Sequence, residues 1–273
     1  MSATASPAIR SLYLSHGGGP MPLMGDPAHA QMVETLRRIA GMMPKPSTVI
    51  VVSAHWEMHR PTVTRAARPP LLYDYYGFPE TAYTITYPAP GDPDLADAVT
   101  RALETEGIGA AADGQRGFDH GLFVPLKLMY PDADIPCIQL SLVKGLDPAL
   151  HLRMGEALAH LKHDGLLIVG SGFSFHNMEA FFAPASERQM KNDAFLAWLA
   201  ETCSSTALGE TERRERLLQW ERAPYARYCH PRAEHLLPLH VCYGAAGRAC
   251  DSLFEPEIFG VKAGTFLWSS SAI

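Results

Sequence analysis

Cysteine is scarce in this sequence, and a long apolar run is absent. The five cysteines are odd in number and none forms a Cys-x-x-Cys pair, so neither a disulfide framework nor a zinc finger is expected. No apolar stretch approaches the roughly 20 residues that a membrane-spanning helix needs. The stretch Met1–Arg10 lacks the basic and apolar regions of a secretory signal. We therefore expect a cytoplasmic protein that does not act at a membrane.

Charge is also sparse. Charged residues make up 19% of the chain, the formal net charge is -6, and the 23 basic residues are scattered. The chain thus lacks the clustered basic surface with which proteins bind nucleic acid. Apolar residues make up 47% of the sequence, which is enough for a core and is not typical of disorder. With no repeat and no clear linker, the 273 residues predict one domain over 1–273.

Three familiar catalytic motifs are missing as well. The sequence contains no His-Glu-x-x-His and no Gly-x-Ser-x-Gly, which are typical of zinc proteases and serine hydrolases. The glycines at 17–19 lack the spacing and the lysine of a phosphate-binding loop. A protease, a serine hydrolase and a nucleotide-hydrolysing enzyme are therefore poorly supported.

The pattern of apolar residues predicts strands alternating with helices. The expected helices, with Asp92 and Ser186 as N-caps, are Ala28–Met43, Asp92–Glu106, Pro148–Lys162, Ser186–Thr202, Glu210–Trp220 and Pro231–Gly247. The expected strands are Ser11–Ser15, Thr48–Ser53, Ala82–Tyr87, Pro136–Leu142, Leu166–Gly170 and a final pair within Ile258–Trp268. This alternation predicts an α/β fold, a single domain with a largely parallel or mixed central sheet and helices on both faces. The stretch Arg60–Pro90 is expected to form a loop or β excursion over the site.

Histidines recur just after the predicted strands. His16 follows Ser11–Ser15, His55 follows the run ending at Ala54, and His176 comes shortly after Leu166–Gly170. Ligands of open α/β sheets collect beyond the carboxyl ends of the strands. The repetition therefore predicts one shared metal or acid–base site at this edge of the sheet.

Three more histidines have sequence neighbours that make them candidates for the same site. His120 follows Asp119, whose carboxylate is a candidate to fix the ring tautomer. His230 and His235 bracket the predicted start of the last helix, and their five-residue spacing excludes a simple helical ligand pair. We expect one of the two to bind metal and the other to contact substrate. The remaining histidines are interpreted as ordinary packed or solvated side chains: His29, His59, His151, His160, His163 and His240.

These residues fit a mononuclear site of two or three imidazoles, with or without one carboxylate. Imidazole binds zinc, copper and iron(II) alike, so the ligand type alone does not select the metal.

Five motifs in register carry a family resemblance from Leu12 to Trp268. They are Ser15-His-Gly-Gly-Gly-Pro20, Val51-Val-Ser-Ala-His-Trp-Glu57, Phe118-Asp-His-Gly121, Gly170-Ser-Gly-Phe-Ser-Phe-His-Asn177 and His230-Pro-Arg-Ala-Glu-His235. In these segments the chain resembles the DODA-type class III extradiol ring-opening dioxygenases, the DOPA 4,5-dioxygenase family.

The resemblance implies a non-haem iron(II) centre, with zinc as the alternative metal. His16, His55 and His235 would be the metal ligands. His176 would be the acid–base residue or a fourth ligand, and His120 would contact substrate or dioxygen. In protocatechuate-type relatives the ligand set is two histidines and a glutamate, so Glu234, which precedes His235, stays open as the third ligand.

The resemblance also implies a reaction. The substrate would be a catechol such as DOPA or caffeate, and dioxygen would convert it to a muconic semialdehyde. Arg232 and His230 are the expected substrate contacts, and Arg227 and Lys127 are further candidates for binding a substrate carboxylate.

Two other functions remain open at this point. The same histidines could hold zinc for a hydrolase, because zinc-bound water is a nucleophile near neutral pH. A non-catalytic interaction protein of the Memo-like kind, which shares the general fold, is the second alternative.

Overall fold

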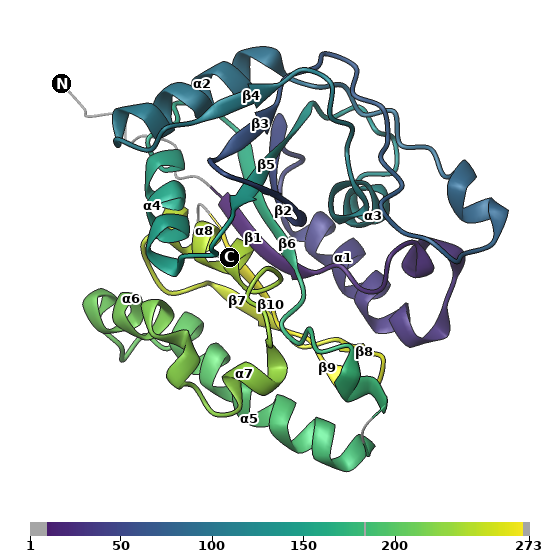
Figure 1. The fold of residues 1–273 in the computed structure, drawn as a ribbon, viewed down its shortest axis with the longest axis vertical. Coiled ribbons are helices and arrows are strands. Elements are labelled where there is room, and N and C mark those ends of the chain that lie inside the picture. Colours follow the sequence, from purple (N-terminus) through teal and green to yellow (C-terminus); the bar gives the residue numbers. More distant parts are fainter. Residues whose placement is uncertain (1–9, 183, 270–273) are drawn as a thin grey trace.

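An eight-stranded sheet forms the centre of the computed structural model, which describes residues 10–182 and 184–269 (Figure 1). Residues 1–9, where a secretory signal is not expected, lie outside the described residues, as do 183 and 270–273. The strand order is β4 (Ala111–Asp113), β3 (Thr62–Thr64), β5 (Cys137–Val143), β2 (Thr48–Met58), β6 (Leu166–Gly172), β1 (Arg10–Ser15), β10 (Thr265–Trp268) and β7 (Ser252–Phe254). A separate hairpin joins β8 (Glu257–Ile258) to β9 (Val261–Lys262).

The central strands β5, β2, β6 and β1 are mutually parallel. Strand β10 runs antiparallel to β1 and β7 runs antiparallel to β10. On the other edge β3 pairs antiparallel with β5. The sheet is therefore mixed with a parallel centre, which confirms the predicted fold class.

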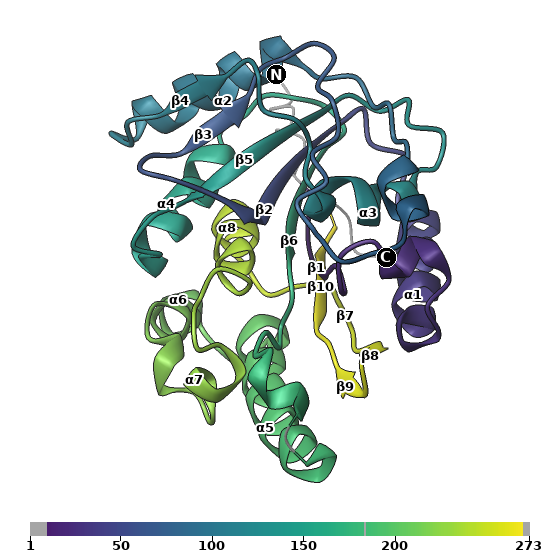
Figure 2. The same cartoon turned by 45° about the vertical axis from the view of Figure 1, so that its right-hand side comes forward.

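Helices cover both faces of the sheet, because side chains along the buried strands alternate between two apolar cores. Val49 and Val51 face the core under α1 (Ala30–Met42) and α3 (His120–Met129). Ile50 and Val52 face the core under α2 (Pro93–Thr105), α4 (Pro148–Leu158) and α8 (Leu237–Ala246). The second view shows these layers on opposite sides of the strands (Figure 2).

A further group of helices lies beyond α8, at the lower end of both views (Figure 1, Figure 2). It consists of α5 (Ala185–Ser204), α6 (Glu210–Leu218) and the short α7 (Ala226–Cys229). Within the described ranges, no helix combines the length and the apolar character required to cross a bilayer.

Local signals predicted several elements well. The Asp92 carboxylate accepts a hydrogen bond from the Leu95 amide and caps α2, as expected. Ser186 is not a cap, because α5 already begins at Ala185. The prediction missed β4 and β7, which have three residues each, and it missed α3; it covered β3 only as part of the loop or β excursion expected at Arg60–Pro90. Helix α3 contains Pro125 and is buried along almost its whole length, so it lacks an amphipathic period.

Two predicted elements differ from the structure. The expected strand Ala82–Tyr87 is replaced by a 3-10 helix at Glu80–Thr84. The backbone groups of this segment form hydrogen bonds with nearby residues instead of with a neighbouring strand. The Ala82 amide donates to the carbonyl of Pro79, and the Ala82 carbonyl accepts from the Tyr75 hydroxyl.

The last long helix begins at Leu237 rather than at Pro231. The His235 carbonyl accepts hydrogen bonds from the Tyr13 hydroxyl and the Phe173 amide, so tertiary contacts hold this segment outside the helix. Pro238 occupies the first turn instead, where its missing N–H has no cost.

Candidate metal centre

Three neighbouring parallel strands bring their histidines to one edge of the sheet. His16 directly follows β1, His55 lies near the end of β2, and His176 comes four residues after β6 ends. Ser15 of β1 and Ser53 of β2 pair with Gly172 and Ser171 at the end of β6. The pairing of β1 and of β2 with β6 therefore ends at the same level, as the sequence predicts, although β2 itself continues along β5 to Met58.

An irregularity in β2 redirects His55. The register of β2 against β5 runs from Ser53 opposite Ser141 to Glu57 opposite Leu142. The intervening residues 54–56 have no counterpart on β5, which is the property of a β-bulge that changes the direction of a side chain. His55 thereby reaches the imidazole of His16, and the two Nε2 atoms lie 3.0 Å apart.

His235 completes a triangle of imidazoles with these two residues. The ring centroids lie 4.9 Å apart for His16 and His55, 5.3 Å for His16 and His235, and 5.0 Å for His55 and His235. The rings of the three residues predicted as ligands are therefore nearly equidistant in the structure.

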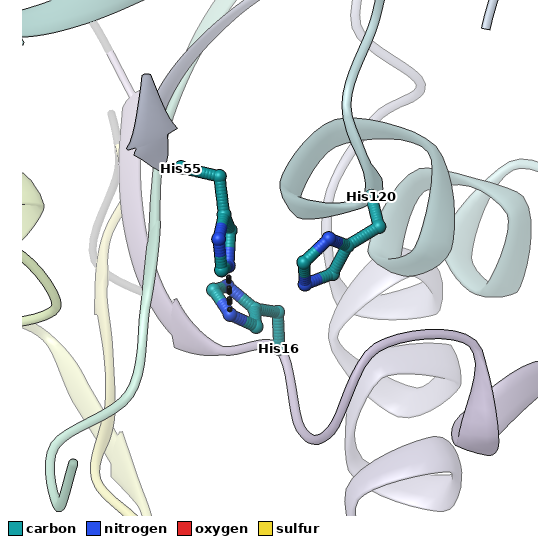
Figure 3. A group of neighbouring side chains, drawn as sticks. All are labelled: His16, His55 and His120. Carbon is teal, nitrogen blue, oxygen red and sulfur yellow. Dashed lines mark hydrogen bonds between the residues drawn. The ribbon is translucent and has the colours of Figure 1, made fainter. Parts of the chain in front are cut away.

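His120 is the first residue of α3 and points toward His16 and His55 (Figure 3). Its ring centroid lies 3.9 Å from that of His55 and 5.4 Å from that of His16. The side-chain nitrogens of these three histidines lie within 4.8 Å of one another. His120 is thus a second candidate, beside His235, for the third ligand position.

Asp74, which the sequence analysis did not single out, orients His120. Its Oδ1 atom accepts hydrogen bonds from the His120 amide at 3.0 Å and from its Nδ1 at 2.8 Å. Its Oδ2 atom lies 3.7 Å from Nδ1 of His55. Burial acts to raise the pKa of the Asp74 carboxyl, but the hydrogen bonds from His120 outweigh it and lower that pKa. Asp74 comes from the stretch Arg60–Pro90, which therefore reaches the site as expected.

Asp119 does not orient the His120 ring, contrary to the interpretation of the sequence. Its carboxylate caps α3 by accepting from the Gly121 amide and also accepts from the Ser53 hydroxyl. Arg116 lies 3.1 Å from its other oxygen. Asp119 therefore joins the start of α3 to β2, and so fixes the position of His120 relative to His55.

One carboxylate serves two stacked histidines on the other side of the cluster. The rings of His176 and His235 are 3.4 Å apart and inclined by 17°. Their Nδ1 atoms lie 3.1 Å and 3.0 Å from Oε1 of Glu234. Although Glu234, His176 and His235 also form a possible ligand group, Oε1 is already occupied as acceptor for both rings. Oε1 thus orients both rings, while Oε2 has no hydrogen-bond partner and lies 3.4 Å from the Arg232 guanidinium.

In each ring of the cluster the Nδ1 atom faces a polar partner. Nδ1 of His16 lies 2.9 Å from the Ser171 hydroxyl. Those of His55 and His120 face Asp74, and those of His176 and His235 face Glu234. A partner on one ring nitrogen fixes the tautomer and directs the other nitrogen, as in most metal-binding histidines. In the tautomers with the proton on Nδ1, every Nε2 carries a free lone pair.

The electrostatics keep three of these rings neutral, those of His16, His55 and His235. Burial, followed by the neighbouring imidazoles, lowers the pKa of His16 and His55 well below the usual value. Burial also lowers the pKa of His235 to about 4, although Glu234 acts in the opposite direction. For Glu234, burial acts to raise the pKa, but hydrogen bonds from His176 and His235 hold it well below its usual value. Near pH 7 the rings of His16, His55 and His235 therefore offer uncharged nitrogens beside an ionised carboxylate.

The residues fit a metal ion. The Nε2 atoms of His16 and His55 lie 3.0 Å apart, a separation that is favourable when the two nitrogens share a proton or bind the same cation. Nitrogens at right angles around a metal, each bound at about 2.1 Å, are separated by about 3.0 Å. The spacing of the two Nε2 atoms thus matches adjacent ligands of one ion.

The two expected substrate contacts have different environments. Arg232 is half exposed at the edge of the histidine cluster, which we call the rim. Its guanidinium lies 2.6 Å from Glu57 and 3.4 Å from Glu234. His230 has no exposed surface; its ring packs edge-on against Phe195, and its Nε2 donates to the Ser174 carbonyl. The structure therefore brings Arg232 to the rim and does not bring the His230 ring into the cluster.

The fold and the cluster together define an α/β protein with a histidine site suited to a metal-dependent enzyme. Comparison with known proteins specifies the class. Residues 8–265 match the family described as the catalytic LigB subunit of aromatic ring-opening dioxygenase. The chain belongs to this family, and it is an extradiol aromatic ring-opening dioxygenase, which confirms the resemblance found in the sequence.

Relatives cover most of the chain. It is 39% identical to dioxygenase tasH of Hapsidospora irregularis, over 96% of this chain and 86% of that one. It is 37% identical to a 4,5-DOPA dioxygenase extradiol of Beta vulgaris, over 87% of each chain. The crystal structure of uncharacterized protein JW3007 from Escherichia coli K12 superposes with a TM-score of 0.73 at 27% identity, over 95% of this chain and 99% of that one. These relatives favour neither the zinc hydrolase nor the Memo-like alternative.

Proposed function

We propose that the chain opens the ring of a catechol that carries a side-chain carboxylate, of the DOPA or caffeate type, using dioxygen to form a muconic semialdehyde. The convergence of His16, His55 and His235, each with an oriented ring, is the observation that carries this proposal. Similar chains from Beta vulgaris, Portulaca grandiflora and Mirabilis jalapa are 4,5-DOPA dioxygenases, which supports this class of substrate.

The proposed ligands are His16, His55 and His235, and the proposed metal is iron(II). Three protein ligands on one face of the ion, with the remaining positions open, are typical of non-haem iron(II) oxygenases. The 3.0 Å between the Nε2 atoms of His16 and His55 supports their binding to one ion, and zinc is the alternative metal. When bound, the metal would lower the pKa of the catechol hydroxyls and hold catechol and dioxygen next to each other.

His176 is the proposed acid–base residue. Its Nδ1 faces Glu234, so the free Nε2 is able to take a phenolic proton. The Glu234 carboxylate then stabilises the imidazolium, from which the proton is returned as the ring opens. His120, oriented by Asp74, is proposed to contact substrate or dioxygen from the opposite side of the cluster.

Arg232 is the proposed partner of the substrate carboxylate. Its guanidinium is 56% exposed and lies at the rim beside Glu57 and Glu234. A guanidinium binds a carboxylate through two parallel hydrogen bonds. Glu57 holds this side chain next to the cluster, so a carboxylate that replaced this contact would place the catechol ring over the histidines.

Metal analysis combined with oxygen uptake tests the assignment. His16→Ala, His55→Ala and His235→Ala are each expected to lose the metal, whereas His176→Ala is expected to keep the metal and lose turnover. His160→Ala is the matched control, since this imidazole is 73% exposed and precedes β6, whereas the cluster histidine His176 follows the other end of that strand. Full metal retention by the first three variants would refute the ligand set.

A further inference from the structure

A histidine outside the cluster holds the segment that follows His16. His29 lies in the short 3-10 helix Pro27–His29 and has no exposed surface. Its Nε2 lies 3.0 Å from the Gly18 amide, and its Nδ1 lies 2.9 Å from Oδ1 of Asp26. The ring therefore connects the glycine segment after His16 to a carboxylate.

The hydrogen bonds define the role of each ring nitrogen. The Gly18 amide is a donor, so Nε2 of His29 must carry the lone pair, and Nδ1–H then donates to Asp26. Burial lowers the pKa of His29, which keeps the ring neutral, although Asp26 acts in the opposite direction. The arrangement is that of a carboxylate fixing the tautomer of an imidazole, with a backbone amide as the final target.

The glycine segment is also packed tightly against two rings. Gly17 has φ +81°, and a Cβ there would lie 2.6 Å from Cδ2 of His29. A Cβ at Gly18 would lie 2.7 Å from Cζ of Phe259, whose ring meets His29 edge-on at 4.5 Å. Only glycine permits this approach and this backbone conformation. Because glycine is the most flexible residue, such a segment needs external contacts to stay in one conformation.

The position of His16 is restrained by the residues on both sides of it in the chain, and the glycine segment is the one that follows it. On the other side it continues β1, where its amide donates to the Gly172 carbonyl at 2.9 Å and its Nδ1 faces the Ser171 hydroxyl. Beyond His16 the chain continues through Gly17, Gly18 and Gly19 into a turn. Only Gly17 separates His16 from the Gly18 amide, so a hydrogen bond that fixes this amide also restrains the backbone of His16.

We propose that His29, oriented by Asp26, is a positioning residue that holds the Gly17–Gly19 turn so that His16 presents its Nε2 to the metal. The inference rests on the proposed function in one respect, that His16 is a metal ligand.

Titration of the metal-free protein with zinc ions, in competition with a chromophoric chelator, measures this effect without turnover. His29→Leu removes the acceptor for Gly18 and is expected to raise the dissociation constant about 10- to 100-fold, as loss of outer contacts to metal ligands does. His29→Gln places an amide oxygen near the position of Nε2 and is expected to restore most of the affinity.

His151→Leu is the matched control. His151 is equally buried, accepts from the Val143 amide through Nε2 and contacts the Asp147 carbonyl through Nδ1, but it belongs to α4 and its ring hydrogen-bonds to neither the Gly17–Gly19 turn nor any of the five clustered histidines. It is expected to lower the midpoint of urea unfolding without changing the zinc affinity. Equal weakening in His151→Leu and His29→Leu, or a His29→Gln variant as weak as His29→Leu, would overturn the proposal.

Two further results separate this inference from the proposed function. If His16→Ala binds zinc as tightly as the unmodified chain, the ligand assignment fails. If His16→Ala loses zinc but His29→Leu does not, only the positioning role fails. Should His29→Leu not fold, Asp26→Ala removes the partner of Nδ1 from a partly exposed position, and unchanged zinc affinity in that variant contradicts the proposal.

Discussion

Replacing Gly172 with alanine would disturb the site through the backbone of a proposed ligand. Gly172 is the last residue of β6, and a Cβ there would lie 2.0 Å from the His235 carbonyl oxygen and 3.0 Å from its carbon. An ordinary carbon–oxygen contact is about 3.3 Å or more. The segment that carries His235 would therefore have to retreat by more than about 1 Å.

The cost follows from the hydrogen bonds that this movement breaks. The His235 carbonyl accepts from the Tyr13 hydroxyl at 2.8 Å and from the Phe173 amide at 3.1 Å. Leaving a buried polar group without its partner costs about 1–3 kcal/mol. Alanine recovers about 0.4–1 kcal/mol by restricting the unfolded chain. We therefore expect a net loss of about 3 kcal/mol in the free energy of unfolding, and a 10- to 100-fold weaker metal affinity.

Urea denaturation of the metal-free protein and a zinc titration measure the two effects. Gly41→Ala is the control: Gly41 lies in α1, and a Cβ there meets no atom within 4 Å. That variant is expected to gain about 0.5–1 kcal/mol and to keep its metal affinity. If Gly172→Ala were as stable as the unmodified chain and bound zinc equally well, the close approach of β6 to His235 would not matter for the site.

Three further predictions follow from single side chains. Glu234→Gln removes the charge shared by His176 and His235, so metal affinity should fall about 10- to 100-fold in a zinc titration that leaves the control Glu221→Gln unchanged. Arg232→Ala should raise KM about tenfold for DOPA or caffeate but much less for plain catechol in oxygen-uptake assays; equal effects on all three would reject the carboxylate contact. Burial lowers the pKa of His240 to about 4, so the unfolded chain binds the extra proton first as the pH falls below 6.5. The stability contributed by this residue should drop by about 2 kcal/mol between pH 7 and pH 5, a loss that urea denaturation should not find in His240→Gln.

The sequence predicted the central sheet because its signals are local and strong. The runs at Ser11–Ser15, Thr48–Ser53 and Leu166–Gly170 are apolar and short, and they correspond to β1, β2 and β6. Since parallel strands align their carboxyl ends, the histidines that follow them were predicted to meet. The expected strand Ala82–Tyr87 failed because its alternation has no neighbouring strand to pair with, and local turn contacts used its backbone instead.

The orientation of the histidines required the tertiary structure. Asp119 is adjacent to His120 in sequence, yet Asp74, which is 46 residues away, binds its ring. Likewise, His230 lies in the same motif as His235, but its ring turns into the apolar core against Phe195. Neighbouring residues point in different directions, and only packing decides which partner each side chain meets.

The sequence alone therefore determined the fold class, the family and the edge of the sheet where the site lies, because strand runs and motifs are written in consecutive residues. Only the tertiary structure decided that Glu234 serves both His176 and His235, and that His29 holds the turn after His16. These contacts join distant segments, and their geometry depends on how the helices and loops pack onto the sheet. A histidine that local context identified as ordinary thus became a proposed part of the metal site.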